Sequence, residues 1–577
     1  MHLDYEMEKV NTLGTGISTC NSADHDIFVS NLQCGEVLCY SVVLIKGGVT
    51  NKNNSLCVPQ NCKIKQFNNF SGLSKTTQWP IINFRFKCLV ELGLEENELV
   101  IECCGRTLEL KLHYKPRKSP LSVIPLYIVC HGHDGKFQAP AGVENSIRSA
   151  CERIALGAKL IQTVIAEKLY ECNFGRKTFQ LETDIDPSAP DCVTFHSQLS
   201  HEKARKMNAH ELWEHFGREL MMSSLGSNNR KFLAFLSCTR YNPPTDGTIP
   251  NTYAEMLSAM EAHVALGGGG LAIFGSACLY TWAKTVEDVL PYLTNQTKVD
   301  SKYFMDDSCY RGTYGSCFST TLGSALHELG HTFDLGHSSD GIMGRGFDNI
   351  DLVFTMPKND NGNRNSSKTC AHIVKPVFRE LSQNSTVCLT RLLQVSYTVT
   401  PLEEKLKYKQ ENINRRVDFN STENVHNAKL HGTDKKFASQ SGNNFEKTNS
   451  LHNKKPNHTT EKLMDISDHT YWSKSCAALL SYHRWFNDYT DEFTGALILD
   501  SVRNVIESSV GIRVVEIRDG SGQILCDWQF LEEKKITEFA LPSEVYSEAG
   551  QLLVAEDSAG NILKHPLPIY AVSALVP

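Results

Sequence analysis

The stretch LHELGHTFDLGH at residues 326–337, followed by SSDGIM at residues 338–343, is the most informative part of this chain for predicting its fold and function. Two of its histidines, His327 and His331, are four residues apart. On a helix they would project from one face, close enough to bind one metal ion. Glu328 is adjacent to them and has the chemistry of a general base for a metal-bound water. The stretch therefore predicts a metal site on a helix.

A third histidine, His337, follows His331 by six residues and can join the pair only if the chain turns back after the helix. Gly336 or Asp334 would supply the left-handed backbone for this turn, because glycine and aspartate are among the few residues that visit it. Three protein ligands leave the fourth position of a tetrahedral zinc ion open, as catalytic sites require. We therefore predict one Zn²⁺ per chain, bound by His327, His331 and His337.

The flanking sequence supports the helix. Apolar residues recur at helical spacing on one face: Leu322, Leu326, Leu329 and Phe333. Residues 319–325 offer candidates for the N-cap of the helix. The alternative is a buried amphipathic helix whose histidines only form hydrogen bonds. That alternative leaves Glu328 and three histidines clustered without a reason, and burying such groups unpaired is costly.

The full pattern, His-Glu-x-x-His-x-x-Asp-x-x-His with Met343 beyond it, resembles that of the metzincin zinc peptidases. The run HELGHTFDLGHSSD is similar to the matrix metalloproteinase signature. The layout of the whole chain resembles a eukaryotic family named "putative zinc metalloproteinases". Members of that family pair an N-terminal β-rich region with a metzincin-type domain. These resemblances cover about twenty residues for the motif and the order of segments for the layout.

The metzincin resemblance implies three zinc ligands, with Glu328 as general base. It implies that Met343 forms an apolar floor under the metal, the Met-turn. Asp340 matches an aspartate that braces that turn in matrix metalloproteinases. Two features depart from the pattern: Asp334 stands where the family has glycine, and the interval from His337 to Met343 is shorter than in matrix metalloproteinases. The cysteine-switch motif of that subfamily is not visible either, so membership of it is not expected.

Composition limits the classes of function. A chain of 577 residues predicts three or four domains, and a net charge of -7 argues against a dedicated binder of nucleic acid or anionic membranes. The sequence has no apolar run of the ~18 residues that a membrane helix needs. The acidic N-terminus does not read as a secretory signal. The twenty cysteines include the adjacent Cys103 and Cys104 and lie mostly in apolar runs. Free cysteines and a cytoplasmic location are therefore expected.

We predict an α+β multidomain fold, in which a zincin-like, metzincin-type catalytic domain is flanked by an N-terminal and a C-terminal β-sandwich domain. The predicted parts are an N-terminal β-rich domain at 1–118, the catalytic domain at 119–399, a disordered Asn/Lys-rich insertion at 400–466, a helix completing the catalytic core within 467–492, and a C-terminal β-sandwich-like domain at 493–577. The insertion is assigned because its apolar residues are too sparse to offset the entropy of ordering.

Hydrophobic patterns place the elements within these parts. Strands are predicted at residues 37–45, 81–90, 98–104, 107–112, 122–130, 178–182, 231–237, 271–275, 511–517, 523–528 and 551–555. Helices are predicted at residues 144–170, 209–222 and 476–486, besides the one that carries the metal site.

Three further stretches have more than one interpretation. The four glycines at residues 267–270 predict a flexible turn before a strand, because they lack the lysine and threonine of a phosphate loop. Residues 131–134, with the sequence HGHD, predict a loop that touches the metal site or a second ion only in the less favoured interpretation. Residues 271–275 are either the edge strand that pairs with an extended substrate or an ordinary core strand.

The first functional hypothesis is a zinc endopeptidase acting on a polypeptide substrate. Zn²⁺ would polarise the scissile carbonyl, and Glu328 would move the proton from water to the leaving amine. Arg345 is the candidate for stabilising the oxyanion. A second hypothesis is a non-catalytic adaptor with a zinc-stabilised core, whose β-sandwich domains bind protein partners or glycans. A third is a zinc amidase for non-peptide substrates. Neither nucleic acid nor a membrane is an expected partner.

Overall fold

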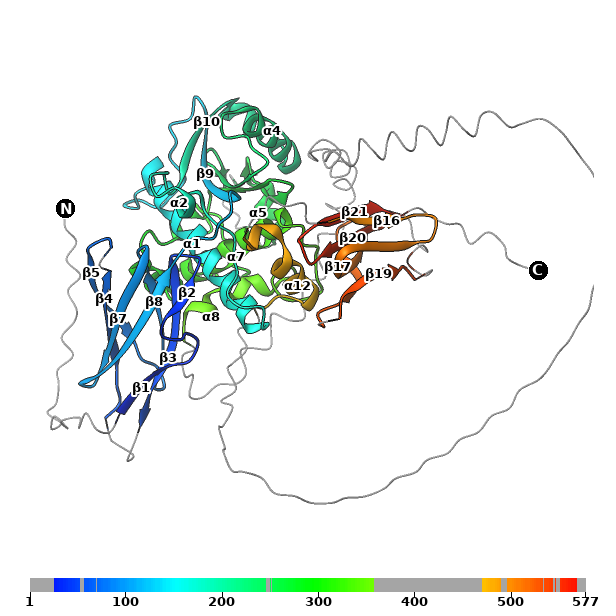
Figure 1. Ribbon diagram of the computed structural model, residues 1–577. Helices are drawn as coiled ribbons and strands as arrows, with labels where there is room; N and C mark the ends of the chain where they lie inside the picture. Colours follow the sequence, from blue (N-terminus) through cyan, green and yellow to red (C-terminus); the bar gives the residue numbers. More distant parts are fainter. Residues whose placement is uncertain are drawn as a thin grey trace, which may run out of the picture. The chain divides into compact units, whose positions relative to one another are not determined.

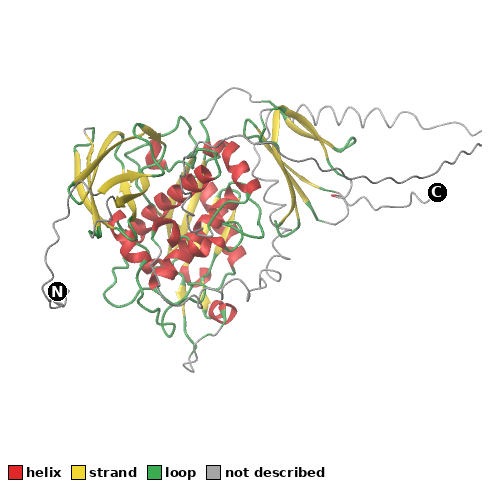
Figure 2. Ribbon diagram, turned by 90° about the horizontal axis from the view of Figure 1, so that it is seen from below, coloured by secondary structure: helices red, strands yellow, loops and turns green. Residues whose placement is uncertain are grey.

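The computed structural model describes residues 25–51, 57–68, 70–244, 250, 252–356, 470–488, 495–532, 534–542, 545 and 550–567. The insertion predicted at residues 400–466 lies outside them. Figure 1 labels the elements in chain order, and Figure 2 shows helices concentrated in one part of the chain, with other segments built almost entirely of strands.

A five-stranded sheet forms the centre of the helix-containing part. Its strands, in spatial order, are β10 (Val193–Ser200), β9 (Ser122–His131), β11 (Arg230–Leu236), β15 (Leu271–Gly275) and β14 (Ala265–Gly268). The first four run parallel, and β14 is antiparallel to β15. All of β9 except its last residue is buried, as expected for a parallel strand covered on both faces.

Helices cover both faces of this sheet. Val123, Tyr127 and Val129 of β9 belong to the core that contains α1 (Ile147–Glu171) and α7 (Tyr314–Thr332). The alternate residues of β9 belong to a second core with α4 (Ala209–Met222). The period of two along the strand thus divides its side chains between the two layers.

Short elements complete this part of the chain. The short helices are α2 (Glu182–Ile185), α3 (His201–Ala204), α5 (Tyr253–Ser258), α6 (Val289–Leu293) and α8 (Asp351–Phe354), with single 3₁₀ turns η2 (Leu279–Thr281), η3 (Val286–Asp288) and η4 (Gly346–Asn349). Two residues each in β12 (Arg240–Tyr241) and β13 (Met260–Glu261) pair antiparallel. After the insertion the chain forms α12 (Lys474–Tyr482) and η5 (Arg484–Phe486), where a helix is predicted.

The N-terminal strands form two sheets. One has the order β1 (His25–Val29), β3 (Val42–Asn51) and β6 (Arg85–Glu91). The other has the order β2 (Glu36–Leu38), β8 (Arg106–Tyr114), β7 (Glu95–Cys103), β4 (Asn61–Asn68) and β5 (Leu73–Pro80). Side chains from both sheets share one apolar core, to which α1 and α7 also contribute.

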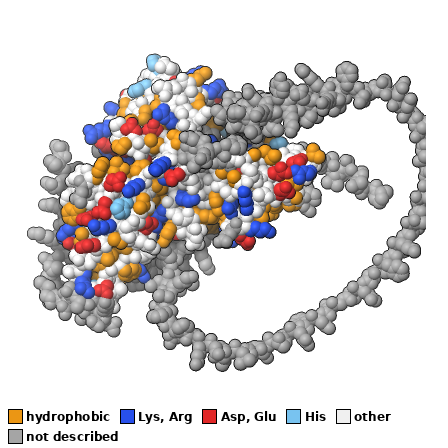
Figure 3. Space-filling view, viewed as in Figure 1, with side chains coloured by type: hydrophobic (Ala, Val, Ile, Leu, Met, Phe, Trp, Pro, Cys, Tyr) orange, Lys and Arg blue, Asp and Glu red, His pale blue; other side chains and the backbone are white. Residues whose placement is uncertain are grey.

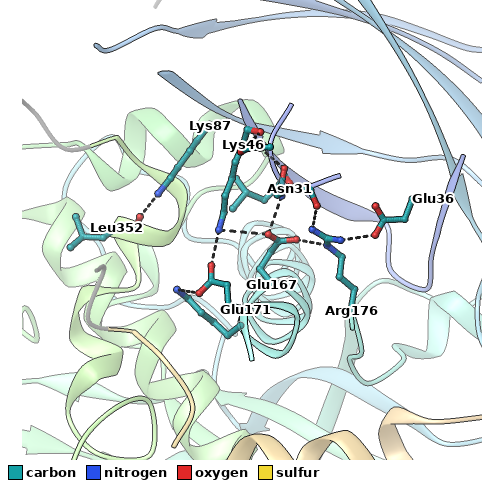
Figure 4. A network of polar contacts seen from close by, with 11 residues as sticks. Asn31, Glu36, Lys46, Lys87, Glu167, Glu171, Arg176 and Leu352 are labelled. Atoms are coloured by element: carbon teal, nitrogen blue, oxygen red, sulfur yellow. Dashed lines mark hydrogen bonds and ion pairs between the residues drawn. The ribbon is translucent and has the colours of Figure 1, made fainter. Parts of the chain in front are cut away.

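Polar contacts fasten the N-terminal strands to α1 (Figure 4). The carboxylate of Glu167, fully buried on α1, accepts hydrogen bonds from Arg176 Nε at 2.6 Å and Asn31 Nδ2 at 3.0 Å. Arg176 Nη1 also pairs with Glu36 Oε1 at 2.5 Å, and Lys46 Nζ pairs with Glu171 at 2.8 Å. The buried Glu167 and Arg176 thus each have partners of opposite charge.

The C-terminal strands form one antiparallel sheet around the long β17 (Val505–Arg518). Its other strands are β16 (Leu497–Asp500), β18 (Ile524–Gln529), β19 (Ile536–Ala540), β20 (Leu552–Asp557) and β21 (Ile562–Pro566). The pairing register of β17 shifts along its length, so that β16 and β19 pair with its first half and β18 and β20 mainly with its second. This sheet has an apolar core of its own.

Several predicted elements need correction. Residues 178–182 were expected to form a strand, but they make only an isolated bridge from Leu181 to Val123, and Glu182 already begins α2. The helix that carries His327 and His331 starts at Tyr314, with Thr313 as N-cap, so residues 319–325 lie inside the helix and do not cap it. Of the two interpretations of residues 271–275, the interior strand is the one found, because the edge position belongs to β14.

None of the helices in the described segments has the length and apolarity needed to cross a membrane. On the face shown in Figure 3, acidic and basic side chains are interspersed.

Candidate metal centre

Helix α7 places the first two histidines. The Thr313 hydroxyl caps the helix by accepting a hydrogen bond from Ser316 N at 3.2 Å, and α7 then continues for 19 residues to Thr332. Its apolar side is buried, so the rotation of the helix about its axis is fixed by packing. His327 and His331 are one turn apart and share a face, as the sequence predicts.

The turn after α7 depends on Asp334, which has φ of +65°, whereas Gly336 is not left-handed. Of the two candidates for the left-handed position, aspartate is therefore the one used. Gly336 is needed for a different reason, because a Cβ there would lie 2.6 Å from Arg518 Nε. This turn brings His337 back to the helical pair.

The Nε2 atoms of the three histidines converge. His331 Nε2 lies 3.2 Å from His327 Nε2 and 3.1 Å from His337 Nε2. Two nitrogens bound to zinc at about 2.0 Å in a tetrahedron would be about 3.3 Å apart. The trio therefore has the spacing that a single zinc ion requires.

The hydrogen bonds of the three Nδ1 atoms explain why a cation fits between the histidine rings. His327 Nδ1 contacts Ile342 O at 2.9 Å, His331 Nδ1 contacts Leu335 O at 2.9 Å, and His337 Nδ1 contacts Ser521 O at 3.2 Å. A carbonyl oxygen can only accept, so each Nδ1 carries the hydrogen and each Nε2 is a bare acceptor. Three lone pairs facing one another without a donor repel, and a metal ion relieves that repulsion.

Electrostatics favours the same neutral form. Burial, followed by the neighbouring His337, lowers the pKa of His327 to about 3. Burial and the other two histidines also lower the pKa of His331 well below its usual range, and burial lowers that of His337. Neutral imidazole is the form that binds zinc, so the residues present fit this ion.

The third histidine is held by the C-terminal strands. His337 N donates to Gly522 O at 2.9 Å, and Ile524 N donates to His337 O at 2.9 Å. Gln523 Nε2 donates to the same His337 carbonyl at 3.1 Å. Together with Ser521 O on Nδ1, these bonds make the turn between β17 and β18 the support of His337. The sequence analysis missed this support, because no local pattern connects residues more than 180 positions apart.

Asp334 joins the same region through its side chain and its carbonyl. Its carboxylate forms an ion pair with Lys564 and accepts a hydrogen bond from His483 Nε2 at 3.2 Å, while its carbonyl accepts from Arg518 Nη2 at 2.7 Å. Burial alone would raise the pKa of Asp334, but Lys564 and His483 outweigh it and hold the pKa well below its usual value. The departure from glycine therefore adds two side-chain contacts that glycine could not make.

Glu328 lies against the edge strand β14. Gly267 packs directly on the α7 backbone there, because a Cβ at Gly267 would lie 1.8 Å from Glu328 O. The Gly267 N–H donates a hydrogen bond to the Glu328 carboxylate, which slightly offsets the effect of burial. Burial raises the pKa of Glu328 to about 8, so this carboxyl takes up a proton readily. Of the four glycines read as a turn, residues 267 and 268 are therefore in β14, and Gly269 with Gly270 makes the turn.

Met343 and Asp340 lie in the segment that follows His337. Met343 is buried, and its Sδ would lie 2.9 Å from a Cβ added at Gly330, so the thioether packs on α7 at this glycine. Asp340 is exposed, and its carbonyl accepts from Ser338 Oγ at 2.6 Å. Backbone bonds also brace the segment, including Ile342 N to Tyr471 O at 2.8 Å.

Arg345, the candidate oxyanion stabiliser, pairs with Asp348 at 3.0 Å and donates to Cys309 Sγ at 3.7 Å. Its guanidinium lies over the ring of Phe347, which in turn packs on His327. The stretch at residues 131–134 is not part of the trio. His133 Nδ1 instead contacts Ser237 Oγ at 3.1 Å and accepts from Gly135 N at 3.2 Å.

Comparisons with known proteins indicate a peptidase family. A family model described as "Putative peptidase family" matches residues 26–444. A "putative zinc metalloproteinase" of Schizosaccharomyces pombe is 27% identical over 347 residues, which cover 57% of this chain and 54% of that protein. A protein of the same description from Saccharomyces cerevisiae is 26% identical over 303 residues, covering 48% and 42%. The chain thus spans about half the length of these relatives.

Among solved structures, Salmonella alpha-2-macroglobulin reacted with methylamine is similar over 17% of this chain and 8% of that one, at 11% identity. Its TM-score of 0.14 is too low to support any argument about the fold.

Proposed function

Because this chain belongs to the family described as "Putative peptidase family", we propose that it is a zinc-dependent endopeptidase with its centre at His327, His331 and His337. The observation that carries this proposal is the convergence of three bare Nε2 acceptors beside Glu328. Three protein ligands leave room for water and substrate on the ion. A purely structural zinc site would need neither that open position nor an adjacent carboxyl group.

A zinc ion at this centre would polarise the scissile carbonyl and acidify the attacking water. Glu328 would take a proton from that water and deliver it to the leaving amine. Met343 packs against Gly330, within the helical turn that carries the first two histidines, which supports assigning it as the Met-turn residue. Arg345 is tied to Asp348, so we assign it no step.

The edge strand β14 suits an extended polypeptide. It is the last strand of the central sheet, and within the described residues β15 is its only strand partner. An extended chain can add to such an edge through backbone hydrogen bonds. Beside it lies a small cavity of ≈ 40 Å³, lined by Ala265 of β14 and by Thr321 and Ser324 of α7. Ser324 is one turn before Glu328, so the cavity adjoins the proposed catalytic face.

Replacing the base while keeping the ligands tests the proposal. Glu328→Gln is expected to bind zinc and fold as the wild type does, while losing roughly 10²–10⁴-fold in cleavage of a peptide library. Glu202→Gln, an exposed glutamate of α3, is the matched control and should cleave normally. The measurement is library cleavage at equal zinc occupancy, with and without a chelator.

Equal, chelator-insensitive cleavage by the wild type and Glu328→Gln would remove the catalytic role. Cleavage of non-peptide amides in place of peptides would favour the amidase hypothesis. A wild type that holds zinc but cleaves neither class would favour the adaptor.

A further inference from the structure

A second group of potential metal ligands lies among the N-terminal strands. His25 begins β1, Cys57 precedes β4, and Cys104 lies in the turn between β7 and β8. A ring nitrogen of His25 and the two Sγ atoms all lie within 4.8 Å of one another. Three residues from three separate segments of the chain thus converge on one point, outside the centre described above.

His25 has the hydrogen-bond pattern of a metal ligand. Its side chain is completely buried, and its Nδ1 contacts Thr50 O at 3.0 Å. Nδ1 therefore carries the hydrogen, and Nε2 is a bare acceptor. In the described part of the chain, this buried Nε2 has no hydrogen-bond partner. The three histidines of α7 and its turn show the same division, with Nδ1 on a backbone carbonyl and Nε2 left for an ion.

The two thiols have a spacing that zinc accepts. Cys57 Sγ lies 3.8 Å from Cys104 Sγ, and two sulfurs bound at about 2.3 Å in a tetrahedron would be about 3.8 Å apart. Spacing alone is not decisive, because Cys62 and Cys88 are also 3.8 Å apart. The Cys57 pair differs by having a histidine nitrogen in the same group, and two thiolates with an imidazole are a donor set that zinc favours.

The backbone at Cys104 is a second indication. Cys104 and Gly105 form the two-residue turn of the β7–β8 hairpin, with φ of +48° and +72°. Such a turn requires positive φ at both positions and favours Asn-Gly or Asp-Gly. A cysteine in the first position is conformationally costly, so a role for its thiol would explain why it stands there. Arg106, next in the chain, donates to His25 O at 3.1 Å and ties the hairpin to β1.

We propose that His25 Nε2, Cys57 Sγ and Cys104 Sγ form a second zinc site. Binding would release two thiol protons to solvent, and the two resulting thiolates would balance the two charges of Zn²⁺. Both cysteines are partly exposed, so water can reach the fourth position. β1 belongs to the three-stranded sheet and the β7–β8 hairpin to the five-stranded sheet, so the ion would cross-link the two N-terminal sheets.

Metal content separates this site from the α7 centre. We expect two zinc ions per chain in the full-length wild type, one in His331→Ala, one in Cys104→Asn and none in the double variant. Cys104→Asn is chosen because asparagine favours the turn that Cys104 occupies, so the hairpin should fold without the thiol. Cys34→Ser, which removes an exposed cysteine outside the group, should keep both ions.

Cobalt substitution supplies a readout that identifies the ligands. Co²⁺ bound to His331→Ala should show a thiolate-to-metal charge-transfer band, and that band should vanish in His331→Ala with Cys104→Asn. Retention of the band with Cys104→Asn, or its absence from His331→Ala, would overturn the second site. A disulfide between Cys57 and Cys104 in protein prepared without reductant would do the same. Loss of peptidase activity plays no part in these outcomes, so failure of the proposed function would not imitate them.

Discussion

The N-terminal and C-terminal strands both contact the helix-containing part, but they contact it in different ways. The N-terminal strands bind the scaffold helix α1 through side-chain contacts such as the ion pair of Lys46 on β3 with Glu171, remote in sequence from the metal ligands (Figure 4). The C-terminal strands instead bind the backbone of His337 itself and the turn before it. One region therefore stabilises the scaffold, while the other completes the metal centre.

The two regions differ in role because a metal ligand on a helix and one beyond the helix end are held in position in different ways. Two ligands on one helix are positioned by the helix geometry, so His327 and His331 need little outside help. A ligand beyond the helix end has no such constraint, and it must be held by hydrogen bonds from another rigid element. In this chain that element is the β17–β18 turn.

The largest expected effect is at Asp334, the residue that links the metal centre to the C-terminal strands. Asp334→Ala would leave Lys564 and the buried His483 without their partner and place alanine at a positive φ. We expect a loss of about 3–5 kcal/mol in unfolding free energy and about 10–100-fold in zinc affinity. Asp334→Asn, which tolerates the backbone but lacks the charge, should lie between. Unchanged zinc affinity in Asp334→Ala, measured by competition with a chelator, would show that this interface does not support the centre.

A second substitution tests whether the contacts of the N-terminal strands support stability without affecting the metal centre. Arg176→Ala would remove the closer of the two ion-pair partners of the fully buried Glu167 and leave Lys46 Nζ at 3.7 Å, at a cost of about 3 kcal/mol in stability. Zinc affinity at the α7 centre should stay at the wild-type value, because α1 supplies no ligand. Denaturant unfolding and chelator competition on the same variant give both numbers. A parallel fall in zinc affinity would mean that the two β regions are not functionally distinct.

The smallest expected effect concerns Lys231, which lies near Asp334 and has its Nζ 4.7 Å from the Trp485 ring. Burial lowers its pKa from 10.5 to about 8. Below pH 8 both the folded and the unfolded chain carry the proton, and the folded state bears the cost of a buried charge. As pH rises from about 8 to 10.5 the folded state loses the proton first, so wild-type stability rises across that window.

Lys231→Met should abolish this rise and be more stable than the wild type at pH 7 by about 1–3 kcal/mol. The lost hydrogen bond from Lys231 Nζ to Gly269 O reduces the gain by roughly 1 kcal/mol. Thermal or denaturant unfolding between pH 7 and 10.5 measures both curves. A variant less stable than the wild type at pH 7 would show that Asp334 needs this cation as a partner.

Much of the helix-containing part could be predicted because its signals are local. The strand at 271–275 and the helix at 209–222 agree with β15 and α4, whose apolar patterns are complete within a few turns or residues. Residues 178–182 look like a strand by the same criterion, but they are apolar because Phe179 and Leu181 fill the core, without a neighbour to pair with along their length. The predicted domain boundaries and the role of Asp340 remain predictions.

The sequence by itself determined the helix, its two histidines and Glu328, because a spacing of four on an α-helix fixes which side chains share a face. It also limited the left-handed residue to Asp334 or Gly336, since few residues adopt that backbone. Only the tertiary structure decided between them, assigned the edge position to β14 and revealed that the β17–β18 turn holds His337. These outcomes depend on contacts between segments far apart in the chain, where hydrogen bonds and packing leave no periodic trace in the local sequence.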